Sequence, residues 1–121
     1  MKYDDLRALI NYNPSTGDVT WRERPLSSFK TVGYAKGWNR RFAGETTGYE
    51  LVKWDAYMME ETYVTMRITV NNNHYNLAKI IWLYMTGEFP QGHVQFRNGD
   101  RRDMRWSNLT TLAGNSGASF F

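Results

Sequence analysis

The chain has 121 residues, a formal net charge of +3, 41% hydrophobic residues and no cysteine. This composition suits one domain with a modest core, and it excludes disulfides and thiolate metal sites. No apolar run approaches the roughly 20 residues of a membrane helix, and the N-terminus lacks the pattern of a signal peptide. We therefore expect a cytoplasmic protein with no membrane partner.

In the first half of the chain, the residue pattern predicts a helix, a turn, a strand and a long loop. The helix is expected over residues 4–11, where leucine and isoleucine recur on one face. Residues 13–17 contain the asparagine, proline and glycine of a turn, and alternation over 18–23 predicts a strand. Residues 25–39 have little periodicity and are expected to form a long loop.

The second half has clearer periodicity. Residues 62–70 alternate strictly and predict a strand, the three asparagines at 71–73 predict a hairpin turn, and 74–77 form the expected return strand. An apolar stripe predicts a helix over 78–86, with Gly87 as its C-terminal cap.

After that helix, the sequence predicts a short strand over 92–97 and a tight turn at 98–100. A last helix is expected to begin near Asn108, with Ser107 as its N-cap. The predicted architecture is a small single α+β domain, β-rich in its N-terminal part, with a hairpin–helix unit at about 91–121.

Four segments match, in order, the pattern of one known family. They are YNPSTGDVTW at 12–21, AG followed by GY at 43–49, residues 75–90 ending in TGEFP, and NGDRRDMRWSNL at 98–109. They are spread from residue 12 to residue 109, and the last is long and specific. On these motifs, the chain resembles the HNH endonuclease-like proteins that are common in tailed bacteriophages.

The resemblance implies a ββα-metal fold, in which a hairpin and the helix after it clamp a divalent ion such as Mg²⁺. In that family a histidine takes the proton of the attacking water, while an acid beside it and a residue of the helix hold the ion. The ion stabilises charge on the scissile phosphate. The family therefore implies one HNH-like domain over residues 1–121 and DNA as its partner.

This chain departs from the family at the reacting positions. The resemblance places the base position at Phe96, the adjacent metal position at Gln95 and the second ligand position near Gly117. A phenyl ring accepts no proton, an amide is a weak ligand, and glycine has no side chain. Asn115 could replace the last of these only if the helix shifted its register. We therefore expect no catalytic residue and no metal cofactor.

One alternative keeps the activity. His93 would act as the base of a rearranged metal-dependent endonuclease, although on an extended strand it shares a face with Gln95 and not with Phe96. Such a site would also need a carboxylate from Asp100 or Asp103.

Positive charge is grouped in two segments, and these are the predicted DNA contacts. Residues 22–41 contain six basic residues and one acid, and residues 97–105 contain four arginines and two aspartates. The residues predicted to contact nucleic acid are Lys36, Trp38, Arg40, Arg41, Arg97, Arg101, Arg102 and Arg105. Two alternatives stay open: the arginines could pair with Asp100 and Asp103, and Trp38 could pack onto the core.

The leading functional prediction is a catalytically degenerate protein that binds DNA without cutting it, in the host cytoplasm if the gene belongs to a phage. The alternative from another class is an interaction protein that binds a host or phage nucleic-acid enzyme and inhibits or redirects it. The run from Trp54 to Tyr63, rich in tyrosine and methionine, would suit such an interface, although core packing explains it equally well.

Overall fold

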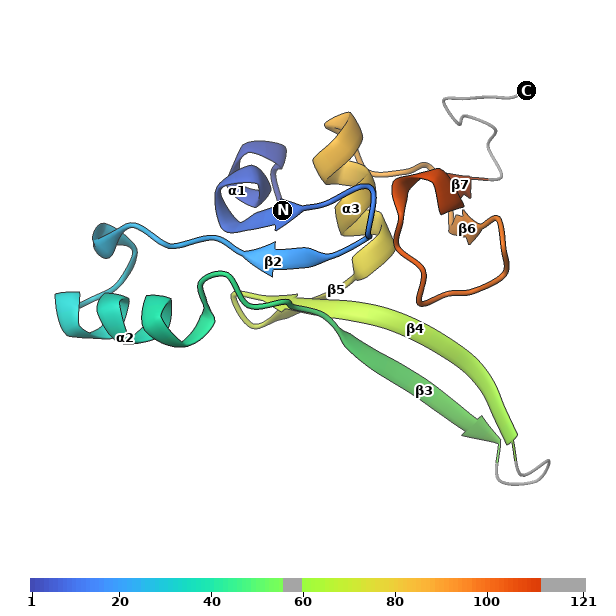
Figure 1. The fold of residues 1–121 in the computed structure, drawn as a ribbon, viewed down its shortest axis with the longest axis horizontal. Helices are drawn as coiled ribbons and strands as arrows, with labels where there is room; N and C mark the ends of the chain where they lie inside the picture. Colours follow the sequence, from blue (N-terminus) through green and yellow to red (C-terminus); the bar gives the residue numbers. More distant parts are fainter. Residues whose placement is uncertain (56–59, 112–121) are drawn as a thin grey trace.

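The computed structural model describes residues 1–55 and 60–111 (Figure 1). Its first half contains helix α1 (Tyr3–Leu9), strands β1 (Ile10–Tyr12) and β2 (Val19–Trp21), a 3-10 turn (Leu26–Ser28) and helix α2 (Val32–Phe42). The second half contains β3 (Tyr49–Asp55), β4 (Glu60–Val70), β5 (Asn73–Asn76), α3 (Leu77–Thr86), β6 (Val94–Phe96), a 3-10 turn (Trp106–Asn108) and β7 (Leu109–Thr111).

Within the described residues, the strands pair in three antiparallel sheets. They are β1–β2, β3–β4–β5 and β6–β7, and the long β3–β4 ribbon extends away from the other elements (Figure 1). The predicted strand over 62–70 lies within β4, and the predicted hairpin turn is confirmed. Asn71 and Asn72 both have positive φ there, at 51° and 67°, which asparagine tolerates better than most residues.

Helix α3 is the centre of the core, as its apolar stripe predicts. Ile80 and Ile81 are fully buried, and the Asn76 side chain accepts a hydrogen bond from the Lys79 backbone N–H at 3.1 Å at the start of the helix. Gly87, with φ at +87°, ends it. The core joins both halves of the chain, because Leu6 from α1 and Leu109 from β7 belong to the same buried cluster.

The prediction of a long loop over residues 25–39 is wrong, because residues 32–42 form helix α2. The side chain of Thr31 caps this helix by accepting a hydrogen bond from the Tyr34 backbone N–H. Only one side of the helix is buried, through Ala35 and the aromatic rings of Trp38 and Phe42. Contacts with distant residues therefore stabilise a helix whose two glycines weaken its local preference.

The last predicted helix is also corrected where the structure describes it. Residues 106–108 form a 3-10 turn, and residues 109–111 form β7, which pairs with β6. The side chain of Asn108 bonds to the loop between these strands instead of beginning a helix. Residues 112–121, where the rest of that helix was expected, lie outside the described residues.

Candidate nucleic-acid site

The two most specific sequence motifs dock on each other. The Tyr12 hydroxyl donates to the Met104 carbonyl oxygen, and the Trp106 backbone N–H donates to the Pro14 carbonyl oxygen at 3.0 Å. Gly17 lies so close to the second motif that a Cβ built on it would be 2.7 Å from the Met104 carbonyl carbon. The N-terminal turn therefore fixes the position of the loop that joins β6 to β7.

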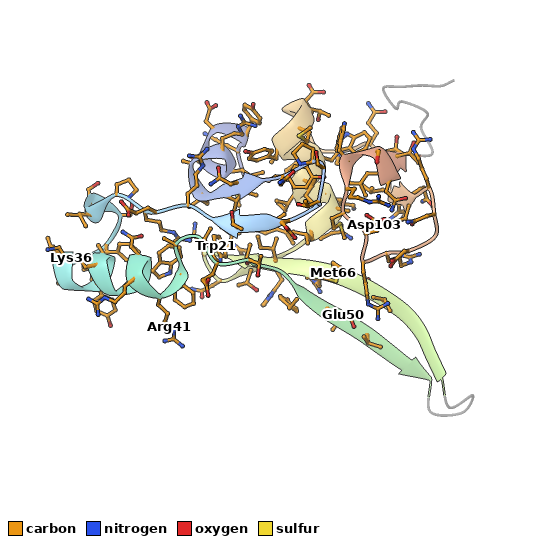
Figure 2. All side chains as sticks on the ribbon, viewed as in Figure 1. Trp21, Lys36, Arg41, Glu50, Met66 and Asp103 are labelled. Atoms are coloured by element: carbon orange, nitrogen blue, oxygen red, sulfur yellow. The ribbon has the colours of Figure 1, made fainter. Side chains whose placement is uncertain are left out.

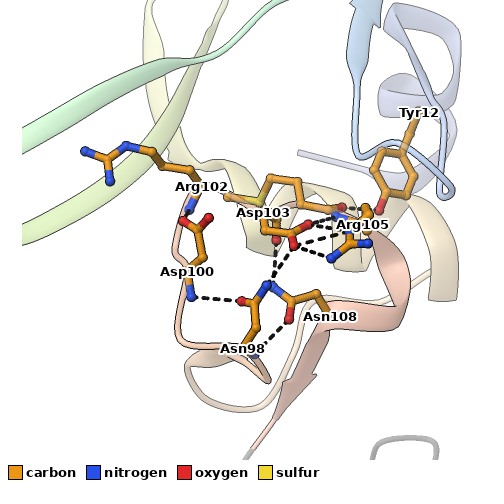
Figure 3. A network of polar contacts seen from close by, with 8 residues as sticks. Tyr12, Asn98, Asp100, Arg102, Asp103, Arg105 and Asn108 are labelled. Atoms are coloured by element: carbon orange, nitrogen blue, oxygen red, sulfur yellow. Dashed lines mark hydrogen bonds and ion pairs between the residues drawn. The ribbon is translucent and has the colours of Figure 1, made fainter.

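Inside that loop, side chains take the place of regular secondary structure (Figure 3). The Asn98 amide donates to Asp103 Oδ2 at 2.8 Å, and the Asn98 backbone N–H donates to Asn108 Oδ1 at 2.9 Å. The Asn108 amide in turn donates to the Asp103 carbonyl oxygen at 3.0 Å. The motif NGDRRDMRWSNL thus has a structural role, because it holds the loop that joins β6 to β7 in one shape. We call residues 98–108 the framework loop.

Asp103 is the ionic centre of this framework. Arg105 Nε and Nη2 donate to the two Asp103 carboxylate oxygens at 2.9 and 2.6 Å. These bonds, together with those from the Arg105 backbone N–H and the Asn98 amide, hold the pKa of Asp103 well below its usual range. The same ion pair raises the pKa of Arg105. The carboxylate is therefore charged throughout the neutral and mildly acidic range.

We expect a melting temperature that falls in acid because of Asp103. A carboxyl whose folded pKa is lowered contributes its stability above its ordinary pKa of about 3.9 and loses it as the pH falls further. The Asp103→Asn variant should melt below wild type at pH 7, and the gap should narrow below about pH 4. Circular dichroism melts from pH 3 to 8 test this. The control is Asp18→Asn, at an exposed aspartate. A pH-independent gap would contradict the assignment.

The other arginines of the loop have different surroundings. Arg102 pairs with Glu50 of β3 through Nε at 2.5 Å and Nη2 at 3.1 Å, and this contact lowers the pKa of Glu50. Asp100 accepts a hydrogen bond from the backbone N–H of Arg102, not from an arginine side chain. Arg105 therefore forms the ion pair with Asp103 that was one of the two alternatives. Arg102 instead pairs with Glu50, a partner that the sequence pattern did not indicate. Arg97, just after β6, is exposed.

A cavity of about 260 Å³ lies between β4, α3 and β6, and we call it the β4–β6 cavity. Its apolar wall consists of Val64, Met66, Val94, Phe96 and Met104. Its polar wall consists of Thr65, Asn76, Lys79, His93, Gln95 and Arg101. Two cationic side chains thus line a small cavity, and none of the described residues that line it is a carboxylate.

The comparison with protein families concerns the segment that surrounds this cavity. Residues 75–113 match the family model described as HNH endonuclease, which includes α3, β6, β7 and the framework loop. This segment, about a third of the chain, is similar to that family. No curated protein and no solved structure matches it. No helix among the described residues has the length and apolar character to cross a membrane.

The positions that the resemblance gives for the base and for one metal ligand are at the β4–β6 cavity. Gln95 and Phe96 both line it, and Phe96 is half-buried against the hydrophobic core, where its ring contributes to packing. Gly117 and Asn115, the alternatives for the second ligand, lie outside the described residues. Among the side chains that the structure describes, no three of His, Cys, Asp or Glu are grouped as metal ligands. The described donor set therefore does not fit the Mg²⁺ ion that the family implies.

The rearranged site around His93 is not assembled in this structure. His93 lines the β4–β6 cavity, but neither Asp100 nor Asp103 does. Asp100 caps the backbone of the framework loop, and Asp103 is engaged by Arg105 and Asn98. The carboxylate that this alternative needs beside His93 is therefore directed to other partners.

Three polar residues of the β4–β6 cavity were not predicted as site residues from the sequence. Lys79 belongs to α3, whose neighbouring positions predict only a buried stripe, and Asn76 was not singled out within the segment 75–90. Thr65 lies on β4, and its buried Oγ1 has no hydrogen-bond partner among the described residues. Such a buried hydroxyl costs about 1–3 kcal/mol when unpaired. No local pattern reveals these residues, because three separate elements bring them together.

The basic residues of α2 form a separate group. Figure 2 shows Lys36 and Arg41 on α2, at the end of the molecule opposite Asp103. Trp38 packs among aromatic rings, with centroids 5.2 Å from Phe42 and 6.0 Å from Trp21. The structure thus supports the packing alternative for Trp38, and it does not unite the two predicted groups of DNA contacts in one site.

Proposed function

We propose that this HNH-like protein binds DNA without cutting it, and that Lys79 and Arg101 hold a backbone phosphate in the β4–β6 cavity. The observation that supports this most directly is the lining of the cavity. At the positions where the family has its base and metal ligand, this chain has a phenyl ring and an amide, and two cationic side chains line the same cavity. None of the described lining residues is a carboxylate. A phosphate would therefore be neutralised by side chains and would need no metal ion.

The polar wall suits a phosphate group through its hydrogen-bond donors as well as through its charge. The Thr65 hydroxyl and the Gln95 amide are hydrogen-bond donors on the cavity wall, and a phosphate oxygen accepts from such groups. A site that contacts only the backbone positions the protein on DNA but does not read the base sequence. We therefore expect similar affinity for duplexes of different sequence.

The Lys79→Gln variant tests the site. Each phosphate contact contributes about 0.9 to the slope of log affinity against log salt, so the variant should reduce this slope by about 1. We also expect about a tenfold loss of affinity at 50 mM salt. Fluorescence anisotropy with a labelled duplex in EDTA measures both quantities. Lys2→Gln, at an exposed lysine before α1, is the matched control and should leave both unchanged. Equal slopes for Lys79→Gln and wild type would refute the phosphate site.

A second candidate function is binding of a protein partner through β3. This strand lies at the edge of its sheet, and it exposes Leu51 at 46% and Val52 at 37%. An exposed, apolar edge strand can pair with a strand of another protein. Affinity capture with Leu51→Glu tests this, beside Leu26→Glu, whose leucine is also 46% exposed. If β3 binds a partner, wild type and Leu26→Glu should both retain a protein that Leu51→Glu does not retain.

A further inference from the structure

Helix α2 lies in a segment of uniform charge. Residues 24–44 contain five basic residues and no acid. Lys36, Arg40 and Arg41 are exposed, whereas Ala35 and Trp38 face the rest of the protein. The positions follow from helical geometry, since residues three and four apart share a face. The solvent-facing side of α2 is therefore cationic from Lys36 to Arg41.

This cationic side is held firmly in place. The Asn39 side chain accepts from the Arg24 backbone N–H at 2.8 Å and donates to the Arg24 carbonyl oxygen at 2.9 Å. The Arg24 guanidinium lies 4.1 Å from the centroid of the Trp38 ring. A helix fixed on one side in this way presents its charges in a set geometry, which lowers the entropic cost of binding a partner.

The surface of α2 is open to close approach. A shallow depression lies over the helix, lined by Thr31, Gly33, Tyr34, Gly37, Trp38, Arg41 and Phe42. A Cβ added at Gly37 would meet nothing within 4 Å, so packing inside the protein does not require glycine there. Tyr34, at 73% exposure, stands beside this open surface.

We propose that the solvent-facing side of α2 is a second DNA-binding surface, separate from the β4–β6 cavity, and that it contacts the phosphate backbone of a duplex. Charge complementarity identifies the partner, because three exposed cations with no acid between residues 24 and 44 match a polyanion. A duplex presents such a uniform row of charge. This proposal rests on the proposed function of DNA binding. Its residues do not line the β4–β6 cavity, so the α2 surface and the cavity site can each be refuted separately.

The test removes charge from α2 only. In Arg40→Gln/Arg41→Gln, the salt slope of duplex binding should fall by about 2, and affinity at 50 mM salt should fall roughly 30-fold. Lys36→Gln and Lys2→Gln form a matched pair of exposed lysines, and only the first should weaken binding. Circular dichroism checks that each variant is folded. An unchanged slope in the double variant overturns this proposal, even where Lys79→Gln weakens binding.

Gly37→Ala separates close contact from general charge attraction. Alanine favours helix over glycine, so the melting temperature should rise by about 4 °C. If duplex backbone lies against α2, the added methyl group should still weaken DNA binding several-fold. A gain in melting temperature with no loss of affinity would overturn the placement of the duplex on the depression over α2.

Discussion

Replacing Gly17 with alanine is expected to lower the free energy of unfolding by about 3 kcal/mol. The residue has φ at +85°, and its new Cβ would lie 2.7 Å from the Met104 carbonyl carbon and 2.8 Å from the Arg105 backbone nitrogen. Both contacts are backbone atoms, which cannot rotate away. For a domain with a stability of about 5–15 kcal/mol, this loss is large. Urea unfolding followed by tryptophan fluorescence measures it.

Gly44 provides a matched control for this substitution. It has the same φ of +85°, but an added Cβ would meet nothing within 4 Å. Gly44→Ala should therefore cost only the conformational penalty, about 1 kcal/mol. The difference between the two variants measures the docking of the N-terminal turn on the framework loop. Equal costs at both positions would contradict that docking.

Replacing Gln95 with aspartate is expected to weaken DNA binding about 30-fold in EDTA. Two like charges about 6 Å apart repel by about 3 kcal/mol at an effective dielectric of 20, and solvent at this half-buried position screens part of this energy. The new carboxylate would both repel the phosphate and attract Lys79. The proposed function requires this loss, because in it Gln95 is a neutral donor beside a phosphate that no metal ion neutralises.

Gln95→Asn is the control for this charge, because asparagine has the shape of aspartate without its ionisation. It should keep the affinity within a few-fold of wild type. Anisotropy titrations of both variants against one labelled duplex decide the matter. If the aspartate and asparagine variants bind equally in EDTA, the phosphate does not lie at the β4–β6 cavity.

Local pattern predicted the elements that have strong periodicity or specific turn residues. The stripe on α3, the alternation of β4 and the Asn71–Asn72 turn are all found, because each follows from neighbours in sequence. Helix α2 could not be predicted in this way. Two glycines weaken it locally, and it is stabilised instead by the stacking of Trp38 on rings that come from other segments.

The candidate site shows the same division. The motifs placed Gln95, Phe96 and the arginines of the framework loop, but not the fact that Arg102 pairs with Glu50 from a different sheet. Lys79 was not predicted, because the apolar stripe of α3 indicates only a helix that packs on the core. Its place in the same cavity lining as Gln95 depends on how β4, α3 and β6 pack, which no spacing along the chain encodes.

The most direct test of the central claim combines binding and cleavage on one preparation of the protein. A labelled duplex and a supercoiled plasmid are incubated with pure protein in Mg²⁺, in Mn²⁺ and in EDTA at constant ionic strength. We predict duplex affinities in the three buffers that agree within about threefold, and a plasmid that stays supercoiled in all of them. Nicking that requires a metal ion and stops in EDTA would contradict the account.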